Sequence, residues 1–275
     1  MTLEPLHAVV YFDDACRATM ADLGLRGFWM GYFAGRAAPL GPVGPDVVAA
    51  MFFNFAPGMV ARALPDAWSI ADPRQVWSAR RTGAAATLRR VVPDVGARAE
   101  RAVPLLARPV AAASAAGRPL FAATRATGWP DDPVEALWHA CTCLREHRGD
   151  GHVAALTASD LDGVEALVLF AASESLPEAL FQAARGWSGD EWSAATTRLR
   201  ARGLLGRSGV TTEGAEMRRA VEAMTDHQAA SPFAVLGPGE QHELLDVLRP
   251  VGAAIHTAGV IAYPNPMGLP EPRGA

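Results

Sequence analysis

The chain has 275 residues, of which 50% are hydrophobic and 20% charged, and its net charge is −4. This composition supplies enough apolar side chains for a folded core and excludes wholesale disorder. Every basic side chain is an arginine; residues 1–130 hold 14 of them against 9 acidic residues, and residues 131–275 hold 11 against 20. The asymmetry predicts different partners for the two halves.

The cysteines and the N-terminus bear on the compartment. Cys16, Cys141 and Cys143 are too few and too unevenly placed for a disulfide framework. The N-terminus lacks the basic region and apolar run of a signal peptide. No uncharged apolar stretch approaches the roughly 18 residues that span a bilayer. We therefore expect a cytoplasmic protein with reduced thiols that does not enter a membrane.

Apolar residues recur with helical spacing along most of the chain. The predicted helices span residues 14–23, 27–36, 45–55, 57–64, 73–91, 97–116, 132–147, 161–172, 177–185, 189–202, 213–229 and 239–258. The clearest strand signal is Leu204-Leu205 facing Val210-Thr211 across a glycine-containing turn, which predicts one short β-hairpin. The fold class we expect is mainly α.

The order of elements over residues 176–219 is typical of a winged helix-turn-helix. This run, LPEALFQAARGWSGDEWSAATTRLRARGLLGRSGVTTEGAEMRR, predicts a helix, a short turn, a second helix, the hairpin and a further helix. It resembles the MarR family of bacterial regulators, in which a similar RGLL segment, wing and TxxG segment follow the recognition helix. The resemblance implies a DNA-binding fold for about 45 residues.

An internal repeat extends this interpretation to the whole chain. The sequence WSIADPRQVWSA from Trp68 resembles WSGDEWSA from Trp187. Matched positions are separated by 118 residues at Asp13, 116 at Arg36 and 115 at Trp77. We predict two tandem winged-helix-like units, 1–116 and 117–235, packed about a pseudo-twofold axis. A C-terminal helix and an extended tail, 236–275, follow them.

A second resemblance is carried by the segments YFAGRAAPLG, FFNFAP, ARALPDAW, ALWHACTCLREHRGDGHVAAL and PNPMGLP. Together they make the chain similar to an actinobacterial family of MarR-like winged helix-turn-helix proteins. That resemblance covers most of the chain. It implies a winged-helix fold and a regulator.

A recognition helix needs polar or basic side chains near its start and cations that hold phosphates. Helix 189–202 begins instead with Asp190 and Glu191, which oppose a phosphate backbone. Helix 73–91 is rich in arginine and has no acidic residue. We therefore predict DNA contacts from Arg74, Gln75, Arg80 and Arg81. The alternative is a solvated arginine-bearing helix with no DNA contact.

The segment 145–152, REHRGDGH, predicts a loop before the next helix. His152 at a helix N-terminus would have a lowered pKa and act as an acid or base, with Asp150 orienting it. Because Arg36 is the repeat equivalent of His152, we expect both to face one cavity that Asn54 lines. The predicted ligand-binding residues are Arg36, Asn54, His147, Arg148 and His152. Alternatively, Asp150 and His147 satisfy backbone groups at helix ends.

A metal or haem site is a weaker interpretation. His139, Cys143 and His147 share one face of helix 132–147, and imidazole and thiolate suit zinc or iron. No HExxH or paired CxxC motif accompanies them, so buried core residues explain the pattern better.

The leading hypothesis is a ligand-responsive, MarR-like transcriptional regulator with a small-molecule pocket between the repeats. Its expected partners are a small molecule, double-stranded DNA and a second copy of the chain. The alternatives are a small-molecule enzyme that uses His152 and Arg36 on a winged-helix scaffold, and a haem- or metal-binding protein. The sequence names no cofactor.

Overall fold

The computed structural model describes residues 3–269 and 271, which fold almost entirely into helices. These are α1 (Glu4–Phe12), α2 (Asp14–Asp22), α3 (Gly27–Ala37), η1 (Ala38–Leu40), α4 (Pro45–Phe52), α5 (Pro57–Ala61), α6 (Ala67–Ile70), α7 (Pro73–Val91), α8 (Val95–Ala112), α9 (Pro119–Ala126), α10 (Pro133–Ala158), α11 (Gly163–Glu174), α12 (Glu178–Arg185), α13 (Gly189–Ala201), α14 (Thr212–Ala230), η2 (Ser231–Val235) and α15 (Pro238–Thr257).

The predicted mainly helical class is confirmed, but the β-hairpin is not. Within the described residues there is no strand, and the wing is reduced to one isolated antiparallel bridge between Leu205 and Val210. Gly206 N–H donates to the Gly209 carbonyl at 2.8 Å and Thr211 N–H to the Leu204 carbonyl at 3.2 Å, so the pairing is confined to the residues beside the turn. The segment 204–211 is called the wing turn below.

The predicted loop at residues 145–152 is wrong, because this segment lies inside α10, a continuous helix of 26 residues. Its glycines serve packing rather than turning. A Cβ on Gly151 would lie 2.5 Å from Arg118 Nη1 and 2.8 Å from Gln228 Oε1. The missing side chain therefore lets the neighbouring segments approach α10, and His152 lies within the helix instead of at the start of a new one.

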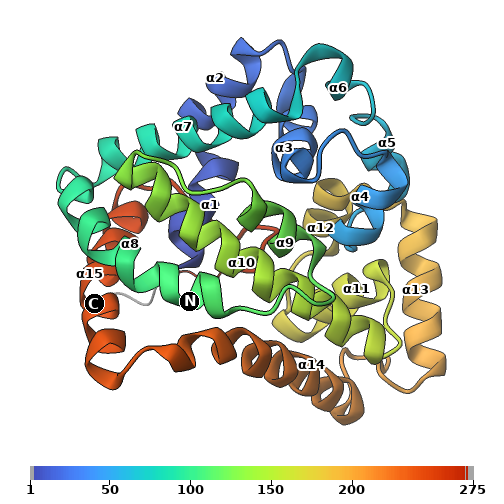
Figure 1. The fold of residues 1–275 in the computed structure, drawn as a ribbon. Coiled ribbons are helices and arrows are strands. Elements are labelled where there is room, and N and C mark those ends of the chain that lie inside the picture. The colour runs from blue at the N-terminus through green and yellow to red at the C-terminus, as the bar shows by residue number, and fades with distance from the viewer. Residues whose placement is uncertain (1–2, 270, 272–275) are drawn as a thin grey trace.

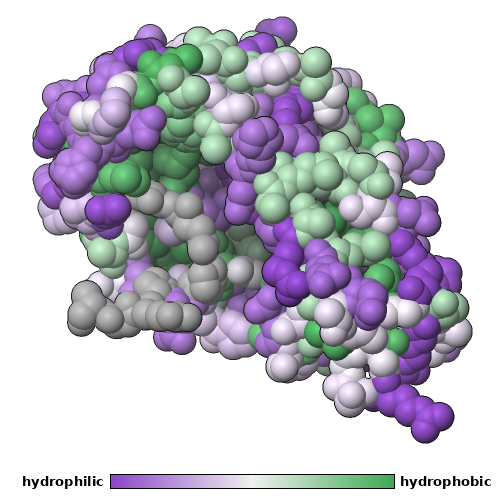
Figure 2. Space-filling view, turned by 90° about the horizontal axis from the view of Figure 1, so that it is seen from below, coloured by the Kyte–Doolittle hydropathy of each residue, from purple (hydrophilic) through white to green (hydrophobic). Residues whose placement is uncertain are grey.

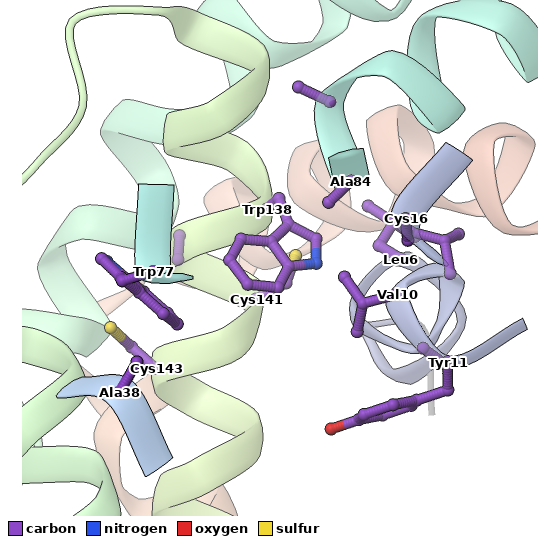
Figure 3. Packing of buried hydrophobic residues seen from close by; sticks show 14 of the residues in the cluster. Leu6, Val10, Tyr11, Cys16, Ala38, Trp77, Ala84, Trp138, Cys141 and Cys143 are labelled. Atoms are coloured by element: carbon purple, nitrogen blue, oxygen red, sulfur yellow. The ribbon is translucent and has the colours of Figure 1, made fainter. Parts of the chain in front are cut away.

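Helix α10 runs through the middle of the molecule and packs against α1, α7, α8, α9 and α14 (Figure 1). Trp138 of α10 is fully buried between α7 and α1, 5.5 Å from the ring of Trp77, and its indole N–H donates to the His7 carbonyl (Figure 3). Cys141 and Cys143 lie one turn further along the same helix, and both are free thiols.

The buried apolar residues form two clusters. The larger draws on residues 6–144 and 236–261, and α15 completes it by packing against α8 and α1. The smaller draws on residues 155–221 and contains Trp192 and Leu199 of α13. One end of α10 therefore belongs to each cluster.

After α15 the chain turns back across the body of the protein. Ile261 and Asn265 are buried, and Arg185 of α12 donates to the Pro266 carbonyl. A Cβ on Gly268 would lie 2.8 Å from the Phe170 ring. This segment therefore ties the larger cluster to α11 and α12. Seen from below, the surface is hollowed between two lobes bordered by both apolar and hydrophilic residues (Figure 2).

Over the part of the chain that the structure describes, no helix combines the length and the apolar character needed to cross a membrane.

Candidate functional site

Helices α11, α12 and α13, the wing turn and α14 follow one another in winged helix-turn-helix order. Helix α12 ends at Gly186 in the left-handed conformation (φ 78°). Two residues later, Ser188 opens α13 with a capping box that includes Glu191. The turn that links α12 to α13 is therefore short, as in a helix-turn-helix.

Helix α13 is anchored by three residues on one face. Trp192, Ala195 and Leu199 are at most 2% exposed and pack the helix mainly against α11. On the other side of the wing turn, Thr211 accepts the Gly214 N–H at 3.1 Å and so caps α14. A Cβ on Gly214 would lie 2.1 Å from the Leu204 carbonyl oxygen, so this glycine is required for the wing turn to dock on α14.

The opposite face of α13 is open. It exposes Asp190, Ser193, Thr197 and Arg200, which recur with helical spacing, and α13 lies at the edge of the molecule (Figure 1). Arg207 is exposed at the tip of the wing turn. Among the residues that the structure describes, neither Arg200 nor Arg207 has a carboxylate within salt-bridge distance.

The other two arginines of this region are neutralised. Arg198 bonds the carboxylates of Asp162 and Glu165 at 2.6 and 2.7 Å. Arg202 bonds Glu165 and the Ser159 carbonyl. These contacts fix α13 to the start of α11. They leave Arg200 and Arg207 as the cations available to a partner on this face.

The acidic start of α13 is partly accounted for by capping. Glu191 Oε2 accepts the Ser188 N–H at 2.9 Å and the Ser188 hydroxyl at 2.7 Å. These hydrogen bonds to Ser188 hold the pKa of Glu191 below its usual range. Asp190 alone faces outward without such a role.

Helix 73–91, which the sequence favours for DNA contact, is the helix α7, but its arginines are differently placed. Arg74 is exposed, and Gln75 is exposed with its Oε1 accepting the Asp72 N–H in a capping box. Arg80 is only 3% exposed, and Arg81 is half-buried 3.5 Å from Glu135. Arg80 therefore cannot reach a duplex in this conformation, because α1, α2, α3 and α10 enclose that face.

Arg36 takes part in a buried ion-pair network. It donates through Nε and Nη2 to both oxygens of Glu146 at 3.0 and 2.9 Å, and Arg145 donates to the same carboxylate at 3.0 Å. Burial alone would raise the pKa of Glu146, but the charges of Arg36 and Arg145 hold it well below its usual range. Arg36 is thus occupied by a protein carboxylate.

The other predicted ligand-binding residues have separate partners. His147 packs its ring against Phe121, and burial and the nearby Arg118 lower its pKa to about 4. Arg148 pairs with Glu222 and Asp226 of α14. His152 lies 3.0 Å from the Thr225 hydroxyl, and its pKa is lowered by burial instead of by a helix N-terminus.

Asp150 does not orient His152. Its Oδ2 accepts the Phe121 N–H at 2.9 Å and so caps the start of α9, as the alternative interpretation predicted. Asn54 lies beyond α4; its carbonyl accepts the Trp187 indole N–H, while its buried side-chain oxygen has no partner. In the described structure, Arg36 and His152 thus bond different protein partners, Glu146 and Thr225.

The metal interpretation gains no support from the geometry. His139 Nε2 lies 3.5 Å from Cys143 Sγ in the interior, and His147 faces Phe121 elsewhere. Burial raises the pKa of Cys143 to about 12 and lowers that of His139 to about 4. Over residues 3–269 and 271, no three His, Cys, Asp or Glu side chains are grouped so as to hold a metal ion.

Sequence reasoning missed a second polar group in the interior. His7 bonds Thr142 Oγ1 at 3.0 Å and Tyr11 Oη at 2.9 Å, and Arg80 Nη2 donates to the same Tyr11 oxygen at 3.0 Å. Burial lowers the pKa of His7 well below its ordinary value, so the ring is neutral. The signal was present in the spacing of Glu4, His7 and Tyr11 along one apolar helix.

Comparison with known proteins gives one finding. The profile of a helix-turn-helix family matches residues 1–262. No curated protein and no solved structure matches the chain.

Proposed function

We propose that this chain, which belongs to a helix-turn-helix family, is a MarR-like transcriptional regulator that presents α13 and the wing turn to duplex DNA. The observation that carries the proposal is the open face of α13, whose cations Arg200 and Arg207 are exposed and unpaired within the described chain. A winged-helix protein needs this combination: one helix free to enter the major groove and a wing free to reach the adjacent backbone.

Each exposed group on that face has a defined task in this proposal. Arg200 neutralises a phosphate beside the C-terminal end of α13, and Arg207 neutralises one beside the wing turn. Ser193 and Thr197 bond base edges, and Asp190 accepts a hydrogen bond from a cytosine amino group, which turns the acidic start into a specificity element. Trp192 and Leu199 hold the helix in place from behind.

The proposal retains the division into two units at residues 1–116 and 117–235. Only the second unit offers an open recognition helix, so reading two half-sites requires a second copy of the chain. A homodimer on a two-fold symmetric DNA site is therefore the assembly we propose.

The test is DNA binding by the full-length protein. The protein is used to select duplexes from a randomised pool, and binding to the enriched duplex is followed by fluorescence anisotropy over a range of salt concentrations. The double variant Arg200→Ala/Arg207→Ala should bind at least about tenfold more weakly. Its plot of log K against log salt should be less steep by about 0.9 for each lost phosphate contact.

The matched control is Arg249→Ala on α15, an exposed arginine at the far side of the molecule from α13 (Figure 1). It should leave both affinity and salt slope unchanged. Equal loss in the two variants would indicate non-specific attraction to arginine, and failure to enrich any duplex would refute the proposal.

A further inference from the structure

A cavity of about 240 Å³ lies between α1, α2, α3 and α7, away from α13. Its walls are largely apolar and aromatic, with Val10, Met20, Leu25, Phe28 and Tyr32 among them. An engineered cavity of about 150 Å³ lined by apolar side chains is large enough for benzene. This one therefore has room for a single-ring molecule with a polar substituent.

Arg80 lines this cavity and is its unusual feature. The side chain is 3% exposed, yet its only hydrogen bond in the described structure is from Nη2 to Tyr11 Oη. No carboxylate of the described residues lies within salt-bridge distance of it. By contrast, Arg36, whose side chain is 9% exposed, is held by both oxygens of Glu146. A buried guanidinium without a counter-charge is costly, and its unused N–H groups are available to an anion.

The nearby carboxylates are committed elsewhere. Asp13 accepts from Ala15 N–H, Thr87 and Arg90. Glu146 is shared by Arg36 and Arg145. Among the described residues, no acidic side chain lines the cavity itself.

Arg80 is also held in position by its neighbours. Tyr11 receives the Arg80 hydrogen bond and bonds neutral His7, which in turn bonds Thr142. The guanidinium lies over the rings of Tyr11 and Trp138, 5.0 and 5.7 Å from their centres. Such a preorganised cation loses little side-chain entropy when it binds a ligand.

Two glycines on α3 let the site form. A Cβ on Gly35 would lie 3.2 Å from Arg80 Nη1, and one on Gly31 would lie 3.1 Å from Met20 Cβ. The bare backbone of α3 therefore forms one wall against which Arg80 and Met20 pack. At the offset that pairs Trp77 with Trp192, Arg80 corresponds to Ala195, so the second unit has no such cation.

We propose that this cavity binds a small organic monocarboxylate with an aromatic or similarly sized apolar body, whose carboxylate bonds Arg80. Arg17 also lines the cavity, but it is paired with Asp14 at 3.3 Å and bonds the Phe12 carbonyl. Arg80 is therefore the cation without a counter-charge, and it suits one carboxylate better than a phosphate. The inference does not depend on the proposed DNA binding. Phe28, Leu25 and Tyr32 hold the apolar body, and Arg80 selects for the charge.

The experiment compares phenylacetate with its neutral analogue phenylacetamide. Binding is measured by isothermal titration calorimetry and by the methyl resonances of protein labelled with ¹³C-methyl methionine. Met20 lines the cavity and packs beside Arg80, so its methyl group reports occupancy of this site through the ring current of the probe. Phenylacetate should shift the Met20 resonance and bind at least about tenfold more tightly than the amide.

Two variants separate charge from shape. Arg80→Met should remove the preference for the acid, because the charge is lost and an apolar side chain remains. Leu25→Phe should fill the cavity and abolish binding of both probes while Arg80 stays in place. Arg125→Met is the matched control: this half-buried arginine lies over the Phe121 ring on α9, away from the cavity, and its loss should leave binding unchanged.

No shift at Met20, equal affinity for acid and amide, or an Arg80→Met variant that still prefers the acid would each overturn the proposal. The comparison of acid with amide needs no variant, so it decides the question even if Arg80→Met fails to fold. Because no readout involves DNA, failure here is distinct from failure of the proposed regulator function.

Discussion

Helices α7 and α13 begin in the same way but differ in how far neighbouring helices cover them. Each opens with a capping box, and each buries a tryptophan, Trp77 or Trp192, whose indole N–H has no partner. In each case a preceding tryptophan, Trp68 or Trp187, donates to a backbone carbonyl. These parallels fall at positions that the predicted repeat pairs with one another. Yet α7 is enclosed by α1, α2, α3 and α10, whereas α13 packs mainly against α11 and leaves one face open.

The difference lies in the residues that follow the tryptophan. Helix α7 carries Gly83 six residues after Trp77, and a Cβ there would lie 3.0 Å from the Cys16 Cα, so α2 can lie directly against it. Helix α13 carries Ser193, Thr197 and Arg200 on its outer face, where all three are exposed in the described structure. The shared capping box and tryptophan thus determine where each helix starts. The packing of neighbouring segments decides whether the helix keeps a face exposed to a partner.

The largest effect we predict concerns the buried carboxylate of Glu146 on α10. Glu146→Gln leaves Arg36 and Arg145 inside the protein without their counter-charge, and should lower the free energy of unfolding by about 3–5 kcal/mol. Urea denaturation followed by circular dichroism measures this. Glu243→Gln, which breaks a half-exposed pair with Arg101, is the control and should cost less than about 1 kcal/mol. Similar costs for the two variants would show that the buried network contributes no special stability.

A smaller effect should separate α7 from α13 directly. Gly83→Ala places a Cβ 2.9 Å from Thr19 Oγ1 and 3.0 Å from the Cys16 backbone, and should destabilise the protein by about 1–3 kcal/mol through overpacking. On α13, Gly189→Ala meets nothing within 4 Å and should be neutral or stabilise by up to about 1 kcal/mol. Equal responses in thermal unfolding would mean that α7 is not packed as closely as the structure indicates.

Much of this architecture could be predicted from the sequence. Apolar periodicity and cap residues located most helices, because those signals are local. The segment 145–152 was predicted as a loop because Gly149 and Gly151 signal turns, and only tertiary contact with Arg118 explains them inside a helix. Arg80 was assigned to DNA from composition, although it shares the spacing of Trp77, Ala84 and Leu88 and so belongs to the buried face.

The site itself was harder to predict than the fold. The open face of α13 depends on which helices leave it uncovered, and that is decided by contacts between distant segments. The free state of Arg200 and Arg207 depends in turn on Asp162 and Glu165 pairing with Arg198 instead. Neither the exposure of α13 nor the pairing of its arginines can be predicted from local sequence. The acidic residues at the start of α13 even argue against DNA contact by this helix.

The smallest effect we predict concerns Asp150 on α10, between the parts of this helix that belong to the two apolar clusters. Burial, with a smaller contribution from the charge of Glu146, raises the pKa of Asp150 from its ordinary value of 3.8 to about 6. The hydrogen bond from the Phe121 N–H and the charges of Arg36 and Arg118 partly oppose this rise. The folded protein therefore holds this proton more tightly than the unfolded chain does. The contribution of Asp150 to the free energy of unfolding is therefore fully present below about pH 4 and is lost as the pH rises through 6.

Asp150→Asn keeps an oxygen to accept the Phe121 N–H but has no charge to bury. Its free energy of unfolding should exceed that of the wild type by about 1–2 kcal/mol at pH 8, and the gap should close toward pH 4. Taking the difference between the two proteins by urea denaturation at each pH cancels the titration of the buried histidines. If the gap stayed constant with pH, the carboxyl group at this junction would be ionised in the folded protein throughout. In that case α9 would be capped by a charge, and the junction would resemble the ion-paired interior around Glu146.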